Sequence, residues 1–235
     1  MAEHTKRPWI ADGPKALGPL NLDQVGRAAT LFAMSLNPYL DEFRRLHGEL
    51  PLAERRAAGL APAGDAAFAQ RDELRARYSF AVPNSAAIAA IVACGPILEI
   101  GAGTGYWAYL LRAAGADVLA YDDAPPGGER PNIWHPADRP FSEVLPGGPT
   151  EAARCPERSL LLVWPPYDRA MAAAALRAYR GPTLIYVGED RGGATATVSF
   201  FTSLERDWQR RRRVAIPTWH RIADSLQVFA RKEHS

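Results

Sequence analysis

The sequence predicts an α/β protein built on a doubly wound, mostly parallel sheet with an antiparallel hairpin at its C-terminal end. Three observations lead to that class. From about residue 80 onward, short apolar runs alternate with helical stretches; a glycine-rich turn directly follows one of the runs; and two β-like segments close the chain. Strands that alternate with helices pair in parallel and carry helices on both faces of the sheet.

Length and composition bound the class of protein further. The 235 residues are enough for one sizeable core, and 47% of them are hydrophobic. The formal net charge is only +2, whereas a protein that binds nucleic acid by charge usually carries a basic stripe. The balance therefore argues against nucleic acid as a partner.

No feature of the chain predicts secretion, a membrane span or a metal site. The first residues lack the apolar stretch of a signal peptide, and no run approaches the roughly 18 apolar residues of a membrane helix. Cys94 and Cys155 have no metal-type or CxxC spacing, so we expect two reduced thiols. The five histidines share no ligand spacing either. These observations predict a soluble, cytoplasmic protein.

The chain divides into a helical N-terminal extension, residues 1–80, and a sheet-forming core, residues 81–235. In the extension, apolar residues spaced by three and four predict a helix over 22–36. Asn37-Pro38 interrupts it, because the residue before proline avoids helical geometry. A second helix is expected over 38–50, and a third from the N-cap Asp65 to about Tyr78. The extension is expected to form a lid or a homodimer contact.

In the core, strands and helices alternate in order. The predicted strands are 96–100, 117–121, 159–163 and 183–187, and the predicted helices are 84–93, 106–114, 168–179 and 199–207. The tail offers the β-like segments 212–216 and 225–231. Between residues 122 and 159 the sequence is rich in proline and glycine, and the expected third strand is 132–134.

The glycine-rich turn carries the main functional signal. Gly101, Gly103 and Gly105 follow the first core strand and precede a helix, with Glu99 just before them. Backbone N–H groups come close to a ligand at this place in an α/β sheet, and glycine lets the chain turn sharply there. The next strand ends at Asp122, where a carboxylate can accept hydrogen bonds from ribose hydroxyls. The alternative is that Asp122 and Asp123 only form a strand-ending turn.

With these residues, the chain resembles the class I, Rossmann-like S-adenosylmethionine-dependent methyltransferases. The resemblance covers about residues 78–231 and rests on the segment from Glu99 to Gly105, followed by Asp122. It implies S-adenosylmethionine as cofactor, S-adenosylhomocysteine as product, and an antiparallel hairpin strand at the end of the sheet. It also implies a cofactor site at Glu99, Gly101, Ala102, Gly103, Gly105, Asp122, Asp123 and Trp164. A nicotinamide enzyme fits less well, because Tyr106 stands at its third glycine position.

A second motif points to the methyl acceptor. The segment Trp164-Pro-Pro-Tyr167 follows the fourth strand and resembles the Asp/Asn-Pro-Pro-Tyr motif of methyltransferases that act on amino nitrogens. That resemblance implies that the Pro165 carbonyl accepts from the acceptor amine and that the Tyr167 ring stacks on a planar substrate. Tyr78, just before the first core helix, is expected either to close the pocket or to serve in packing. Trp164 replaces the acid or amide of the family, and its indole offers only a donor. The alternative is a rigid turn with buried aromatic rings.

Three other features each have two interpretations. His135 follows the expected third strand and is either a general base or an exposed loop residue. Glu189 and Asp190 end the fifth strand, where they face either substrate or solvent. The arginine run 210–213 is expected to be a solvated edge that discourages strand pairing, with phosphate contact as the alternative.

The sequence thus predicts a methyltransferase that acts on a small molecule, with nitrogen ahead of oxygen as the acceptor atom. Two alternatives stay open. One is methyl transfer to nucleic acid or protein, which the near-neutral charge argues against. The other is a catalytically silent module that binds S-adenosylmethionine or a nucleoside, which the missing acid at Trp164 favours.

Overall fold

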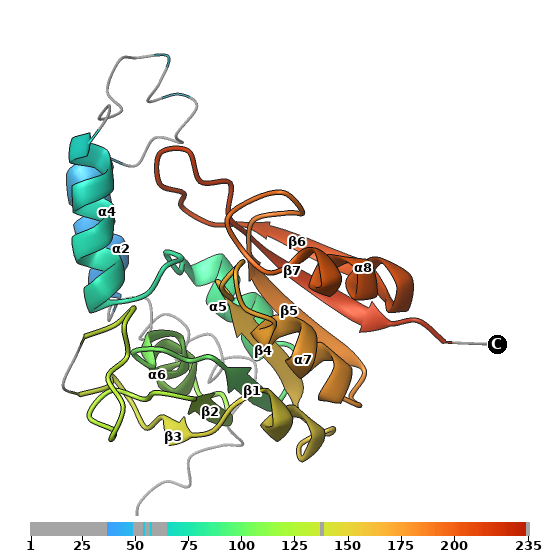
Figure 1. Ribbon diagram of the computed structural model, residues 1–235. Helices are drawn as coiled ribbons and strands as arrows, with labels where there is room; N and C mark the ends of the chain where they lie inside the picture. Colours follow the sequence, from blue (N-terminus) through green and yellow to red (C-terminus); the bar gives the residue numbers. More distant parts are fainter. Residues whose placement is uncertain (1–36, 49–53, 55–56, 58–64, 137–138, 234–235) are drawn as a thin grey trace, which may run out of the picture.

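The computed structural model describes residues 37–48, 54, 57, 65–136 and 139–233 (Figure 1). These residues form one seven-stranded sheet with helices on both sides. The strands are β1 Ile97–Ile100, β2 Val118–Asp122, β3 Leu145–Pro146, β4 Ser159–Val163, β5 Thr183–Gly188, β6 Trp208–Ala215 and β7 Ser225–Arg231. The helices are α2 Pro38–His47, α4 Asp65–Arg77, α5 Ser85–Val92, α6 Tyr106–Ala113, the 3-10 helix η1 Pro149–Ala153, α7 Met171–Ala178 and α8 Val198–Asp207.

The strand order is β3-β2-β1-β4-β5-β7-β6, which confirms the predicted fold class. Strands β1 to β5 pair in parallel, whereas β7 runs antiparallel between β5 and β6. The chain order reverses at β1, which has β2 on one side and β4 on the other. In open α/β sheets, ligands bind outside the carboxyl ends of the strands at such a reversal.

Alternating side chains of the strands build two cores. In β4, Leu161 packs with α5 and α6, while Leu160 and Leu162 pack with α7 and α8 on the opposite face. This follows from the two-residue period of a strand. Both faces are covered, as Figure 1 shows, so the short strands β1 and β4 are buried almost throughout and mostly apolar.

Side-chain caps explain several helix starts. The side chain of Asn37 accepts from the Leu40 N–H at 3.1 Å, and Pro38 follows as the first residue of α2. Asn84 caps α5 in the same way, and Thr197 caps α8. The predicted start of α2 is therefore confirmed. The helix expected over 22–36 lies outside the described residues.

Helices α2 and α4 lie side by side at one end of the sheet (Figure 1). An ion pair joins Arg77 of α4 to Glu42 of α2 at 3.2 Å. Their buried residues, including Tyr39 and Leu74, belong to the same apolar cluster as α5 and α6. The division of the chain at residue 80 stays a prediction.

The third strand was predicted in the wrong place. Residues 132–134 form no strand; β3 is instead the two-residue segment Leu145–Pro146. The reason is local, because the Asn132 side chain accepts from the N–H groups of Trp134 and His135 at 3.0 and 3.1 Å. An Asn side chain that bonds its own neighbouring backbone favours a turn over a strand ladder.

Two element starts also differ from expectation. Helix α7 begins at Met171 and not at residue 168, because Pro166 forms an isolated bridge with Thr195 and the chain then turns. Strand β6 begins at Trp208, four residues early, because the buried Trp208 pairs with Arg231 of β7. Its arginine run is exposed, as expected; Arg213 pairs with Asp190 at 3.0 Å, and Arg210 donates to Gln227 at 3.1 Å.

Candidate cofactor and acceptor site

The glycine turn between β1 and α6 is a tightly packed loop. Its first two N–H groups, those of Gly101 and Ala102, donate to the Tyr121 carbonyl of β2 at 2.8 and 3.0 Å. Gly103 has a φ of +54°, and a Cβ placed there would lie 2.7 Å from the His135 ring. Any side chain at position 103 is therefore excluded by backbone strain and by steric contact.

Asp122 joins this loop to the end of β2. Its Oδ2 accepts from the Gly103 N–H at 2.8 Å, and its Oδ1 accepts from Ala124 at 2.9 Å and from the Asn132 amide at 3.4 Å. Burial raises the pKa of the Asp122 carboxyl, while the Ala124 and Gly103 N–H groups oppose that rise. The carboxylate thus orders the loop through a direct hydrogen bond.

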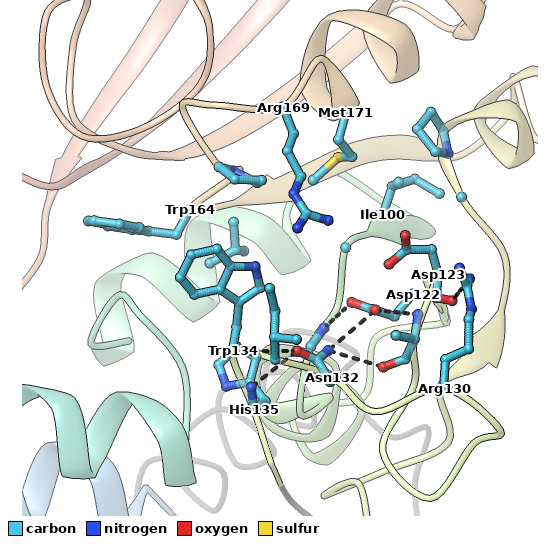
Figure 2. A pocket seen from close by; sticks show the side chains of 18 of the residues that line it. Ile100, Asp122, Asp123, Arg130, Asn132, Trp134, His135, Trp164, Arg169 and Met171 are labelled. Atoms are coloured by element: carbon cyan, nitrogen blue, oxygen red, sulfur yellow. Dashed lines mark hydrogen bonds between the residues drawn. The ribbon is translucent and has the colours of Figure 1, made fainter.

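These residues border a pocket of about 390 Å³ at the carboxyl ends of the parallel strands (Figure 2). Four neighbouring strands contribute to its lining where they end: Ile100 and Gly101 at β1, Asp122 and Asp123 at β2, Gly147 and Gly148 after β3, and Val163 and Trp164 at β4. Its volume lies within the roughly 300–1,000 Å³ of small-molecule sites. The pocket therefore occupies the position that the strand order indicates for a ligand.

The loop before β3 forms one wall of the pocket and was not assigned from the sequence. Asn132, Trp134 and His135 all contribute to the lining, and Figure 2 shows them beside Asp122. Arg130 and Arg169 add two guanidinium groups, and Arg130 donates to the Asp123 carbonyl. In the sequence, the place of Arg169 two residues after Tyr167 was the signal that could have assigned it to the pocket.

His135 is buried against the glycine turn, and not exposed. Burial lowers the pKa of its imidazole to about 4, so the ring is neutral at pH 7. Its ring meets the edge of the Phe80 ring, with centroids 5.6 Å apart. Its role as a general base stays a prediction.

Glu99 lies behind the loop and not in the pocket. It is 1% exposed, and burial raises its pKa to about 8. The backbone N–H of Ala108 in α6 faces its carboxyl group, while Oε2 has no partner among the described residues. Glu99 is therefore placed to act on the loop through α6. Ala102 and Gly105 likewise belong to the loop but do not line the pocket.

Tyr78 does not reach the pocket. Its hydroxyl donates to Glu42 at 2.6 Å, and its ring stacks on Tyr39 with centroids 5.0 Å apart. The segment does pass over the glycine turn, because the Tyr78 carbonyl accepts from the Thr104 hydroxyl. Phe80, two residues later, lines the pocket instead.

The motif after β4 is only partly at the pocket. Trp164 and Pro166 line it, but Tyr167 is 64% exposed and lies outside the lining. The Pro165 carbonyl accepts from the Ala196 N–H at 2.8 Å. The structure therefore does not bring Pro165 or Tyr167 into the pocket.

Trp164 points away from the pocket, as Figure 2 shows. It has a φ of +49°, which is uncommon for a residue with a side chain. Its ring stacks on Phe80 at 4.8 Å, and its Nε1–H donates to Asp224 Oδ1 at 2.7 Å. Burial raises the pKa of Asp224 to about 7, and the Trp164 hydrogen bond opposes that rise. A carboxyl group thus lies beside the motif, although not at position 164.

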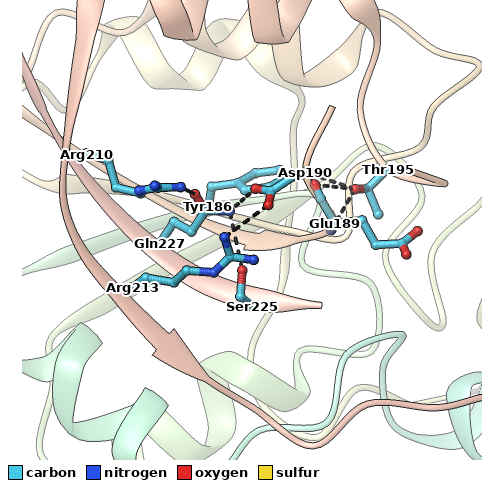
Figure 3. A network of polar contacts seen from close by, with 8 residues as sticks. All are labelled: Tyr186, Glu189, Asp190, Thr195, Arg210, Arg213, Ser225 and Gln227. Carbon is cyan, nitrogen blue, oxygen red and sulfur yellow. Dashed lines mark hydrogen bonds and ion pairs between the residues drawn. The ribbon is translucent and has the colours of Figure 1, made fainter. Parts of the chain in front are cut away.

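Glu189 and Asp190 have structural partners (Figure 3). Glu189 accepts from the N–H groups of Ala194 and Ala223 at 2.7 and 2.9 Å. Asp190 pairs with Arg213 and accepts from the Gln227 amide at 2.8 Å. Both carboxylates therefore hold the loops around β5 and β7, and neither lines the pocket.

The described part of the chain holds no group of three His, Cys, Asp or Glu that could bind a metal ion. Cys94 and Cys155 are free thiols. No helix in the described ranges is long and apolar enough to cross a membrane.

Comparisons with known proteins show likeness in structure only. No family profile and no curated protein matches the sequence. Magnesium protoporphyrin IX methyltransferase from Synechocystis, with S-adenosylmethionine bound, is 12% identical over 88% of this chain and 97% of its own, with a TM-score of 0.41. With S-adenosylhomocysteine bound, the same enzyme is 12% identical over 88% of this chain and 100% of its own, again with a TM-score of 0.41.

A third solved structure concerns the conversion of a disulfide bond into a thioacetal group during echinomycin biosynthesis. It is 18% identical over 62% of this chain and 82% of its own, with a TM-score of 0.37. At these scores the likenesses decide nothing about activity. The functional proposal therefore rests on the residues of this chain.

Proposed function

We propose that this protein is an S-adenosylmethionine-dependent methyltransferase that acts on a small-molecule acceptor, with nitrogen ahead of oxygen as the acceptor atom. One observation carries the proposal. The Gly103 N–H donates to Asp122 Oδ2 at 2.8 Å. The glycine turn is therefore joined to the carboxylate that is expected to bind ribose, and both border a pocket of about 390 Å³. This is the pair of elements that the resemblance assigns to the cofactor.

The residues present fit a nucleoside cofactor. A carboxylate offers about four acceptor positions, and three N–H groups contact that of Asp122. The 3.4 Å contact from Asn132 is the weakest of the three and gives way most easily to a ribose hydroxyl. Gly101 and Gly103 leave the loop backbone open to a close ligand.

The lining also fits a small acceptor. Phe80 and Trp134 supply aromatic surface to the pocket, and Trp164 borders it. S-adenosylmethionine supplies an already activated methyl sulfonium when bound, so orienting the acceptor is most of what the protein must do. Two arginines of the run on β6 are already engaged, because Arg213 pairs with Asp190 and Arg210 donates to Gln227. This supports a small acceptor over nucleic acid.

A second function is favoured by one feature of the motif after β4. The Pro165 carbonyl is already bonded to Ala196, and position 164 carries an indole donor and not an acceptor. A module that binds the cofactor without turnover needs no acceptor group there. This candidate differs from the first in turnover alone.

Calorimetric titration of the purified protein with S-adenosylmethionine, S-adenosylhomocysteine and NADH tests the proposal. We expect micromolar binding of the first two and none of NADH. If neither S-adenosylmethionine nor S-adenosylhomocysteine binds, or if NADH binds more tightly, the proposal is contradicted. Transfer of labelled methyl groups to a panel of amines and phenols then separates the two candidates, because the silent module binds the cofactor and labels nothing.

A further inference from the structure

Arg71 of α4 carries buried nitrogen atoms with no hydrogen-bond partner. Its Cζ lies 4.9 Å from the centre of the Trp164 ring and 5.9 Å from that of Phe80, two residues that line the pocket. Its Nε and Nη2 are buried and have no partner among the described residues. A buried donor left without an acceptor destabilises the fold, so such groups need an explanation.

The unpaired atoms form one functional edge. The Nε–H and Nη2–H bonds lie in the guanidinium plane and point in the same direction, so they match the two oxygens of a carboxylate. Arg75, one turn later on the same helix, lacks this feature. Its Nε donates to Asp72 at 2.8 Å and its Nη1 to the Trp134 carbonyl at 3.3 Å. Two arginines on one helix therefore differ in whether the edge is used.

The surroundings of Arg71 suit an organic monoanion. Phe80 and Trp164 stack at 4.8 Å with an interplanar angle of 12°, and the guanidinium lies over Trp164. Aromatic walls favour a planar apolar body and disfavour the strongly hydrated phosphate dianion. Among the charged neighbours, Asp224 acts most strongly on the Arg71 guanidinium, and its carboxyl accepts a hydrogen bond from the Trp164 indole.

We propose that Arg71 binds the carboxylate of the methyl acceptor, which is a small aromatic carboxylic acid. This inference rests on the proposed function, since it assigns the substrate class of the same site. The acceptor lies along Phe80 and Trp164, with its acidic end at Arg71 and its nucleophilic nitrogen toward the pocket. Because Nε and Nη2 are enclosed, α4 must shift slightly to admit it.

Benzoate and benzamide are the probes, because they share a ring and differ in the charged group. Both are titrated calorimetrically into the wild type, Arg71→Gln and the matched control Arg75→Gln, with and without saturating S-adenosylhomocysteine. We expect benzoate to bind the wild type at least tenfold tighter than benzamide does. Arg71→Gln should lose that preference, and Arg75→Gln should keep it.

Three results overturn the inference: equal affinity for the two probes, an unchanged benzoate affinity in Arg71→Gln, or inorganic phosphate binding at Arg71 in place of benzoate. Binding of S-adenosylhomocysteine is measured separately in each protein. If S-adenosylhomocysteine does not bind the wild type, only the proposed function is contradicted, because the benzoate and benzamide titrations without S-adenosylhomocysteine still test Arg71.

Stability supplies a readout that needs no ligand. Removing an unpaired buried donor costs no hydrogen bond, so Arg71→Met is expected to unfold at the same urea concentration as the wild type or at a higher one. Arg75→Met should unfold at a lower urea concentration than the wild type, because it loses the hydrogen bonds of Arg75. A larger loss in Arg71→Met than in Arg75→Met means that Arg71 is structural, and overturns the inference.

Discussion

Two regions beside the pocket, called here the glycine-loop half and the tryptophan half, are built from different kinds of group. The glycine-loop half, residues 101–105 with Asp122, uses backbone N–H groups whose partners lie within one βαβ unit. The tryptophan half, Trp164 with Arg71 and Asp224, uses large side chains from three distant segments. The Gly103 N–H and the Asp122 carboxylate of the first half are bonded to each other, whereas Arg71 of the second half retains unpaired buried donors. The difference suggests a fixed cofactor side and an acceptor side whose polar groups await a ligand.

Each half also contains a buried carboxyl with a raised pKa, which gives the largest expected effect. Burial raises the pKa of Glu99 to about 8 and that of Asp224 to about 7. An acid whose pKa is raised by folding stabilises the protein fully below its unfolded pKa, and the contribution is lost as the pH rises through the folded value. Stability should therefore fall from about pH 4.5 to 8 through Glu99, and from about pH 4 to 7 through Asp224.

Substitution separates the two contributions. Glu99→Gln should remove a pH-dependent loss on the order of 4 kcal/mol, and above pH 8 it should be more stable than the wild type. Asp224→Asn should remove only the loss that ends near pH 7. Urea unfolding from pH 4 to 9 measures both. Parallel pH profiles for the wild type and Glu99→Gln would contradict the account of Glu99.

The glycine-loop half should tolerate no added side chain. Gly103→Ala places a Cβ 2.7 Å from His135 at a φ of +54°, and we expect a loss of about 3 kcal/mol together with loss of S-adenosylhomocysteine binding. Gly115→Ala is the control, because its φ is +86° and no atom lies within 4 Å of the added Cβ. It should lose only about 1–2 kcal/mol and bind normally. Equal losses in urea unfolding would show that contact at position 103 is unimportant.

Local chemistry explains why the glycine-loop half could be predicted. Gly101 to Gly105 are contiguous, and Asp122 follows from the end of one strand. The parallel pairing of β1 to β5 follows from the alternation of strands and helices along the chain, and the antiparallel β7 agrees with what the family resemblance implies for the two β-like tail segments. The third strand was misplaced because the Asn132 side chain bonds its own backbone. A short apolar run does not reveal that competition.

The tryptophan half depends on contacts that no local pattern contains. Trp164 and Asp224 are 60 positions apart, and Arg71 comes from a helix before the sheet. Residues 164–167 follow β4, as expected, but the positive φ of Trp164 and the Ala196 bond to Pro165 redirect their groups. Tyr78 and Phe80 differ by two positions, and packing against Tyr39 decides which of them reaches the pocket.

A smaller effect sharpens the picture of the tryptophan half. Trp164→Phe keeps the ring on Phe80 but removes the 2.7 Å hydrogen bond to Asp224. We expect a loss of about 1 kcal/mol at pH 8 and a smaller loss at pH 5, where Asp224 is protonated. Thermal unfolding at the two pH values measures the difference. S-adenosylhomocysteine binding should not change, and a large change would mean that the two halves are not separate.

The most direct test of the central claim is the affinity for S-adenosylhomocysteine in Asp122→Ala and Asp122→Asn, measured by calorimetry beside Asp117→Ala. Asp117 begins the same strand region but is mostly exposed and pairs with Arg158. Loss of two charge-assisted hydrogen bonds predicts at least about a hundredfold weaker binding in the Asp122 variants. The Asp117 variant should bind as the wild type does. Equal binding in all of these proteins would contradict the assignment of this pocket to the cofactor.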